Sequence, residues 1–132
     1  MAFIQSINWT GLCNHSRMLL AILTIFPLPG EASRIIEVLD SLRAAVAPEG
    51  ECLESLITVA ADEEGVICYT ERWRSREALE HHLASTLYSR VFEAMELSRQ
   101  PPKVEFFQVQ EIGGLEMVAE ARRNRAPARR PE

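Results

Sequence analysis

The sequence predicts an α+β fold in which one four-stranded antiparallel sheet carries helices on one face. Four short runs are rich in β-branched, aliphatic and aromatic residues, and two longer segments carry apolar residues at helical spacing. Their order along the chain is βαββαβ, which is the split βαβ arrangement of the ferredoxin-like fold. A chain of 132 residues has the size of one such domain.

The first strand is expected at residues 18–26, where "MLLAILTIF" is continuously apolar, as in a strand buried on both faces. The same region also resembles a secretory signal, because Arg17 precedes the apolar run and small residues follow it near Ala32. We prefer the strand, because the segment before Arg17 is almost uncharged and cleavage would remove the best strand candidate. At about 12 residues, the run is too short to cross a membrane as a helix.

The first helix is expected to span residues 31–47, between the "PLPG" segment and Pro48. Its inward face is marked by apolar residues three or four positions apart, which are Ile35, Leu39, Leu42 and Val46. Residues 52–60 and 66–73 then predict an antiparallel hairpin, because "DEEG" between them is a tight polar turn.

The second helix follows this hairpin. Ser75 stands at the expected N-cap, and a helical period continues from Arg76 to about Arg99, with a bend near residues 85–86. The prolines of "QPP" end it, and residues 103–111 predict the last strand. After two glycines, "LEMVAEARR" predicts one short helix.

The domain is therefore expected over residues 18–111, after an N-terminal extension (1–17) and before a short helix and basic tail (112–132). The tail is rich in arginine although the whole chain carries a net charge of −5, so the domain itself is acidic. An acidic body argues against nucleic acid as a partner, and no segment predicts a membrane partner. Several strands lack polar alternation, so a second subunit is expected to cover the open sheet face in a homodimer.

The cysteines predict neither a disulfide framework nor a zinc site, because they are odd in number and widely spaced: Cys13, Cys52 and Cys68. A cytoplasmic location fits this pattern best. The sequence also contains no phosphate-binding glycine loop, nucleophile elbow or Rossmann fingerprint.

The most distinctive stretch is "YTERWRSREALEHHLAS", preceded by "PLPGEA" and followed by "VEFFQV". In order and spacing, these segments resemble the antibiotic biosynthesis monooxygenase superfamily of dimeric α+β barrels. The resemblance runs from Met18 to Glu111 and implies a dimeric barrel. Members of this superfamily include cofactor-free quinol and anthrone oxygenases, haem-degrading enzymes and small proteins of no established activity.

The haem-degrading branch can be tested residue by residue. When the stretches are aligned from Trp73, the helical tryptophan of that branch falls on His82 and its iron-ligating histidine falls on Phe92. The asparagine on its first strand falls near Leu23. None of the three residues is retained, so we expect no haem, and no metal or other cofactor is indicated.

Trp73 and His82 are the candidate catalytic residues. In the resembling oxygenases, a tryptophan at this place lines a cleft and its indole N–H donates to a substrate oxygen. The alternative is a core tryptophan whose N–H is bonded to the backbone. Helical spacing places His82 inward beside Leu79 and Leu83, whereas His81 points to solvent. His82 is then either a general base, since imidazole exchanges protons near neutral pH, or a packed histidine.

Five further residues are expected to line an aromatic-binding pocket, or else to belong to the core: Tyr69, Leu79, Leu83, Tyr88 and Phe92. The arginines beside Trp73, which are Arg72 and Arg74, are expected on the opposite face in surface or interface ion pairs, with Glu71 as a possible partner. The first functional hypothesis is a cofactor-independent monooxygenase acting on a small electron-rich aromatic. The second is a non-catalytic dimeric barrel that binds a small hydrophobic metabolite.

Overall fold

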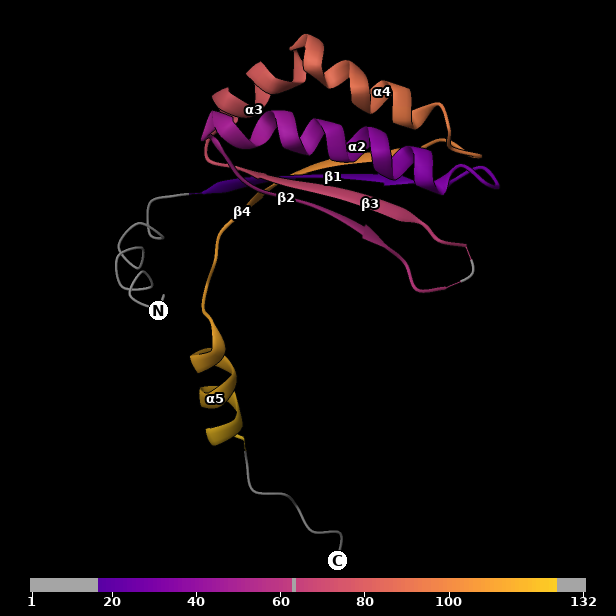
Figure 1. Ribbon diagram of the computed structural model, residues 1–132. Coiled ribbons are helices and arrows are strands. Elements are labelled where there is room, and N and C mark those ends of the chain that lie inside the picture. Colours follow the sequence, from indigo (N-terminus) through magenta and orange to yellow (C-terminus); the bar gives the residue numbers. More distant parts are fainter. Residues whose placement is uncertain (1–16, 63, 126–132) are drawn as a thin grey trace, which may run out of the picture.

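The computed structural model describes residues 17–62 and 64–125, so Cys13, most of the expected N-terminal extension and the end of the basic tail lie outside the described residues. The elements are, in order, β1 (Met18–Ile25), α2 (Ala32–Val46), η1 (Ala47–Glu49), β2 (Cys52–Val59), β3 (Ile67–Trp73), α3 (Arg76–Leu83), η2 (Thr86–Tyr88), α4 (Ser89–Met95), β4 (Lys103–Val109) and α5 (Leu115–Arg123). Figure 1 shows α2, α3 and α4 on one face of the sheet.

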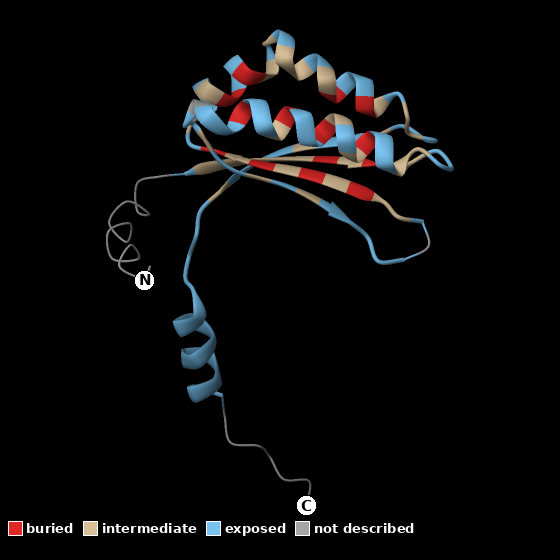
Figure 2. Ribbon diagram, viewed as in Figure 1, coloured by how far each residue is buried: buried red, intermediate tan, exposed pale blue. Residues whose placement is uncertain are grey.

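The four strands form one antiparallel sheet in the order β2-β3-β1-β4. The two central strands are β1 and β3, and their register places Leu23 opposite Tyr69 and Ala21 opposite Glu71. The predicted ferredoxin-like α+β fold is therefore confirmed. Buried residues gather between the sheet and the helices, as Figure 2 shows.

The core forms where the apolar face of α2 meets β1 and β3. Its fully buried members include Ile25, Ile35, Leu39, Leu42, Val46 and Ile67. Full burial of such a side chain stabilises the fold by about 1.5–3 kcal/mol. The four α2 residues predicted to face inward are all buried, so that prediction is confirmed.

The second helical region is interrupted where the sequence predicts a bend. The α3 helix ends at Leu83, a 3-10 turn covers Thr86–Tyr88, and α4 ends at Met95. The prediction that the helix reaches Arg99 is therefore wrong. Residues beyond α4 instead pair with the chain after β1, where the Leu28 N–H donates to the Leu97 carbonyl at 2.9 Å.

None of the described residues covers the sheet face turned away from the helices. On the central strand β1, Leu20 and Ile22 are only partly buried, so the expected burial on both faces is not found in one subunit. Large apolar side chains also stand exposed on this outer face, including Leu56 at 42% and Phe107 at 44% exposure. We call this surface the outer face.

The last helix, α5, lies apart from the rest of the molecule. It extends beyond β4 on the side of the sheet opposite α2–α4, and all of its residues are exposed (Figures 1 and 2). Its bounds agree with the helix predicted from "LEMVAEARR". Within the described residues, no helix has the length and hydropathy that a membrane span requires.

The N-cap of α3 is a feature whose loss is measurable. The Ser75 hydroxyl accepts a hydrogen bond from the Ala78 N–H at 3.1 Å, as predicted for an N-cap. We expect Ser75→Ala to lower the free energy of unfolding by about 1 kcal/mol, because an N–H of the first turn loses its acceptor. Urea denaturation measures the change, and Ser75→Asp, which keeps an acceptor, serves as the control. Equal stability of all three proteins would contradict the capping role.

Candidate active site

The site begins with the alternation of β3. Successive residues of a strand point to opposite faces, and along β3 every second residue is buried beneath the helices. This places Tyr69, Glu71 and Trp73 in one row on the inner face. Glu71 is only 3% exposed, so a carboxylate is enclosed between two aromatic side chains.

The α3 helix supplies the opposite wall. Its buried residues are Leu79 and His82, which are three positions apart and therefore share one side of the helix. His82 is 3% exposed, whereas its neighbour His81 is exposed. The predicted separation of the two histidines is thus confirmed.

The buried carboxylate of Glu71 is held by several donors. The Tyr69 hydroxyl donates to Oε2 at 2.6 Å, and the Trp73 indole N–H donates to Oε1 at 2.9 Å. His82 Nε2 lies 3.3 Å from Oε2, within ion-pair distance. This nitrogen is buried and makes no well-aligned hydrogen bond, so the contact with His82 is looser than the other two.

His82 is fixed mainly by aromatic contacts. Its ring stacks on Trp73 with centroids 4.7 Å apart, and Tyr88 meets it edge to face at 5.4 Å. An imidazole between an indole, a phenol and a carboxylate can carry a positive charge, since the carboxylate compensates it and the indole face attracts cations.

The pKa values of the cluster follow from this enclosure. Burial alone would raise the pKa of Glu71, but the contacts from His82, Tyr69 and Trp73 outweigh it and hold that pKa below its ordinary value. Burial, and then the charge of Glu71, raise the pKa of both Tyr69 and Tyr88. The carboxylate is thus ionised at neutral pH, both phenols keep their protons, and the Tyr69 hydroxyl donates to Glu71.

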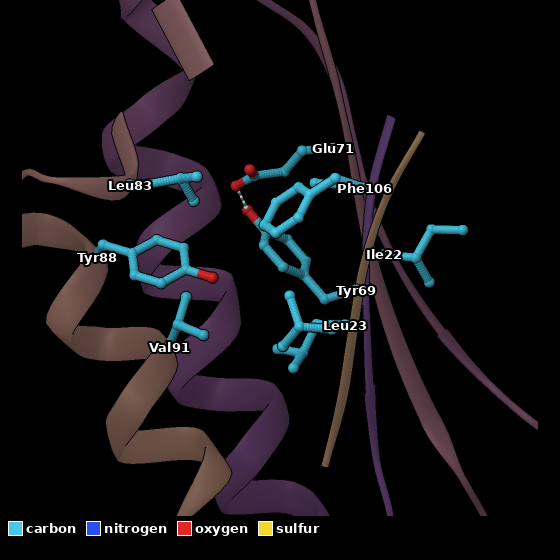
Figure 3. A pocket seen from close by; sticks show the side chains of 10 residues that line it. Ile22, Leu23, Tyr69, Glu71, Leu83, Tyr88, Val91 and Phe106 are labelled. Carbon is cyan, nitrogen blue, oxygen red and sulfur yellow. Dashed lines mark hydrogen bonds between the residues drawn. The ribbon is translucent and has the colours of Figure 1, made fainter. Parts of the chain in front are cut away.

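A small cavity of about 10 Å³ lies beside this cluster, which is room for roughly one water molecule. Figure 3 shows it between the sheet, which contributes Tyr69, Glu71 and Phe106, and the helices, which contribute Leu83 and Tyr88. The hydroxyl of Tyr88 points from the helices toward the sheet, on the side where Tyr69 and Leu23 lie. The cavity is mostly apolar, and Glu71 is its one acidic group.

A larger cleft of about 630 Å³ adjoins the small cavity. Its walls include Leu19, Leu79, Leu83 and Phe106, and Arg76 and Glu80 stand at its rim. Leu83 and Phe106 line both spaces, so these two side chains form the partition between them. Phe106 is 47% exposed on the edge strand β4, where a ring can turn without displacing the core.

The predicted site residues divide between these spaces. Tyr69, Leu83 and Tyr88 line the small cavity, and Leu79 and Leu83 line the large cleft. Trp73 and His82 are brought together, but neither lines either space. Phe92 lines neither and is 56% exposed.

Glu71 is the residue whose place the sequence analysis missed. It was considered only as a partner for an arginine, whereas it lies buried among aromatic rings. Arg72 instead pairs with Glu54 at 3.1 Å on the outer face. The signal that could have located Glu71 is its position between Tyr69 and Trp73 on the buried side of a strand.

Other groups in the described part of the chain offer little for binding. No set of three or more His, Cys, Asp or Glu residues gathers there as a metal site would require. Cys68 is partly buried and lies 3.7 Å from the Thr24 hydroxyl.

Comparison with known proteins agrees with this geometry. Residues 18–94 match the family model described as antibiotic biosynthesis monooxygenase, which covers more than half of the chain. The resemblance seen in the sequence is thereby confirmed. No curated protein sequence is similar enough to count as a relative.

Several solved structures share the fold. A candidate antibiotic biosynthesis monooxygenase from Caulobacter crescentus is 28% identical, with a TM-score of 0.64 over 73% of this chain and 92% of its own. A protein from Pseudomonas aeruginosa is 26% identical, with a TM-score of 0.60 over 74% of this chain and 97% of its own. A protein from Mycobacterium tuberculosis shares the fold at 24% identity, with a TM-score of 0.65 over 74% and 99%.

The pH dependence of the free energy of unfolding tests the role of the buried carboxylate. Because the pKa of Glu71 is lowered on folding, its charge contributes stability that is complete above its ordinary value of 4.5 and lost as the pH falls toward its folded value. We expect Glu71→Gln to cost about 2 kcal/mol at pH 7, since a Gln amide cannot accept from every donor. The difference should shrink as the pH falls below 4.5. Urea denaturation at several pH values measures it.

The matched control is Glu54→Gln, which removes an exposed carboxylate with one arginine partner. Such surface pairs contribute about 0.2–1 kcal/mol. A constant difference between wild type and Glu71→Gln at all pH values would contradict the assignment of the charge to Glu71.

Proposed function

We propose that this chain, which belongs to the antibiotic biosynthesis monooxygenase family, is a cytoplasmic, cofactor-independent monooxygenase acting on a small electron-rich aromatic of the quinol or anthrone type. The observation that carries the proposal is the cluster of Glu71, His82 and Tyr69 between strand and helix, next to a cleft whose lining is partly apolar and partly charged. Such substrates react with dioxygen once deprotonated, so a base and a dry cleft are the main requirements.

The substrate is proposed to bind in the larger cleft. Its volume of about 630 Å³ falls in the range of small-molecule sites, and Leu79, Leu83 and Phe106 offer contacts to a flat ring. A turn of the Phe106 ring joins the cleft to the small cavity, where Tyr69 and Tyr88 converge. The Tyr88 phenol is suited to donate to the oxyanion that forms on the substrate, whereas the Tyr69 hydroxyl already donates to Glu71.

The proposed base is His82, the residue the sequence analysis also favoured. Its Nε2 faces the carboxylate of Glu71, so its other ring nitrogen is left for the substrate proton. Glu71 then stabilises the imidazolium, as the carboxylate of a nucleophile–histidine–carboxylate arrangement does. Trp73 acts as a positioning residue, because its indole N–H is bonded to Glu71 and its ring stacks on His82.

The proposed reaction balances without a further reductant. For an anthrone-type substrate, His82 removes a proton from the methylene, and the carbanion bonds to dioxygen, giving a peroxide anion. The protonated His82 returns its proton to the peroxide, and the O–O bond then breaks as the second hydrogen leaves the carbon as a proton and joins the released hydroxide. A CH₂ group and O₂ thus become C=O and water, and the four electrons that the oxygen accepts come from the substrate.

One observation favours the second candidate, a non-catalytic barrel that binds a small hydrophobic metabolite. His82 and Trp73 line neither space in the single chain, and the cavity at Glu71 has room for about one water. A protein of this kind would bind aromatics in the larger cleft without consuming oxygen.

Oxygen uptake distinguishes the two candidates. With a panel of hydroquinones and anthrones, we expect His82→Ala to lower kcat by a factor of about 10²–10⁴, the usual contribution of a general base. His81→Ala is the matched control, because it removes the adjacent, exposed histidine, and it should leave the rate unchanged. Trp73→Phe should also reduce kcat, because the Trp73 ring and its N–H bond to Glu71 hold His82 in position.

The outcomes separate the hypotheses clearly. Uptake that is absent from wild type with the whole panel, together with binding of the same aromatics, would support the non-catalytic barrel. Equal rates in wild type and His82→Ala would remove His82 from the mechanism while leaving oxygenase activity in place.

We further propose that the protein is a homodimer joined through the outer face. The support is the apolar character of that face, on which Leu20, Ile22 and Phe107 lie on neighbouring strands. A second copy related by a twofold axis would cover the same residues on both subunits.

A charge in the outer face tests this dimer. We expect Leu20→Glu to shift the protein from dimer to monomer, since the substitution buries an unpaired carboxylate in the interface. Arg34→Glu on the exposed side of α2 is the control. Size-exclusion chromatography with light scattering measures the mass, and a monomeric wild type at micromolar concentration would overturn the dimer.

A further inference from the structure

We infer that α5 is an arm that docks on a second copy of this chain. The starting observation is that the helix has no cover of its own. All nine residues from Leu115 to Arg123 are exposed, and Ile112 and Leu115 reach 78% and 82% exposure. A helix of this length is marginal in water when nothing packs against it, because helices below about 12–15 residues rarely hold alone.

The helix is amphipathic, which indicates a packed side. Leu115, Val118 and Ala119 are three or four positions apart and share one side, on which the long side chain of Arg122 also lies. Glu116, Glu120 and Arg123 occupy the opposite side. In the first turn, Glu116 accepts from the Gly114 N–H at 3.2 Å. A helix with one mostly apolar side is a docking element rather than an irregular tail.

The position of α5 indicates the surface on which it docks. Figure 1 shows the helix on the side of the sheet opposite α2–α4, which is the side where the proposed second subunit lies. Phe107 and Val109 of β4 face outward there, and exposed Ile112 continues this apolar line to Leu115. The apolar side of α5 is thus continuous with the outer face, and a subunit covering that face would meet both surfaces.

The arm also lies beyond the part of the chain that matches the family model, which ends at residue 94. In a twofold dimer each subunit would extend its arm to the other, so each apolar residue of α5 contributes twice.

This inference rests on the proposed dimer, and the test is designed to separate the two. The variant Leu115→Gln/Val118→Gln removes the apolar side, and Glu120→Gln/Arg123→Gln is the matched control on the polar side. Both changes preserve the net charge, and glutamine is a good helix former. We expect the first to raise the dimer dissociation constant at least tenfold and the second to change it less than threefold. Analytical ultracentrifugation from nanomolar to micromolar concentration measures both constants.

Hydrogen exchange distinguishes docking on the partner from docking on the same chain. We expect the α5 amides to be protected at concentrations where the protein is dimeric and to lose that protection on dilution to monomer. Protection that persists in the monomer would overturn the inference, because the helix would then pack on its own sheet.

Three further outcomes are decisive. A dimeric wild type whose dissociation constant is unaffected by Leu115→Gln/Val118→Gln overturns the arm alone, whereas a monomeric wild type overturns the dimer and the arm together. Binding to vesicles containing phosphatidylglycerol that Leu115→Gln/Val118→Gln abolishes, with the dimer unchanged, would assign the helix to a membrane surface and overturn docking on a second copy.

Discussion

The structure of the inner face depends on one buried negative charge. A carboxylate enclosed between two aromatic rings is stable only when donors replace the water it has lost. Tyr69 and Trp73 supply two such donors from the same strand, and His82 supplies a third contact from α3. Because this last contact joins helix to sheet, the charge of Glu71 constrains where α3 lies. The Ser75 cap and the interruption after Leu83 are what allow a short helix to present His82 at that point.

The same charge determines what chemistry the site can perform. A carboxylate whose pKa is held low is a poor proton acceptor, so Glu71 is better suited to stabilise a neighbouring cation than to act as the base. The loosest of its contacts is the one to His82. The raised pKa values of Tyr69 and Tyr88 keep both phenols protonated beside the cavity. One carboxylate, one imidazole and two phenols are therefore arranged in an enclosed part of the inner face.

Local patterns predicted the fold well but predicted the site only in part. Alternation along β3 and helical spacing in α3 are short-range properties, so the strands, the Ser75 cap and the inward direction of His82 followed from the sequence. Glu71 was missed because glutamate is ordinarily exposed, and its burial depends on a histidine eleven positions later. Phe92 was predicted to line the pocket with Tyr88, and its ring does meet that of Tyr88 edge to face at 5.4 Å. It nevertheless stays 56% exposed, because the buried side of α4 is formed by Val91 and Ala94.

The alternation of β3 also connects the site to the outer face. Glu71 points inward to the acid–base cluster, and the next residue, Arg72, points outward to Glu54 on β2. The two faces of the sheet are thus formed by adjacent residues of one strand, and a shift of β3 moves both sets together. A second subunit on the outer face would restrict β1 and β3, the strands that carry Leu23, Tyr69 and Glu71. Association of two chains and alignment of the site are therefore linked through the backbone of the sheet, although no inner-face side chain needs to touch the partner.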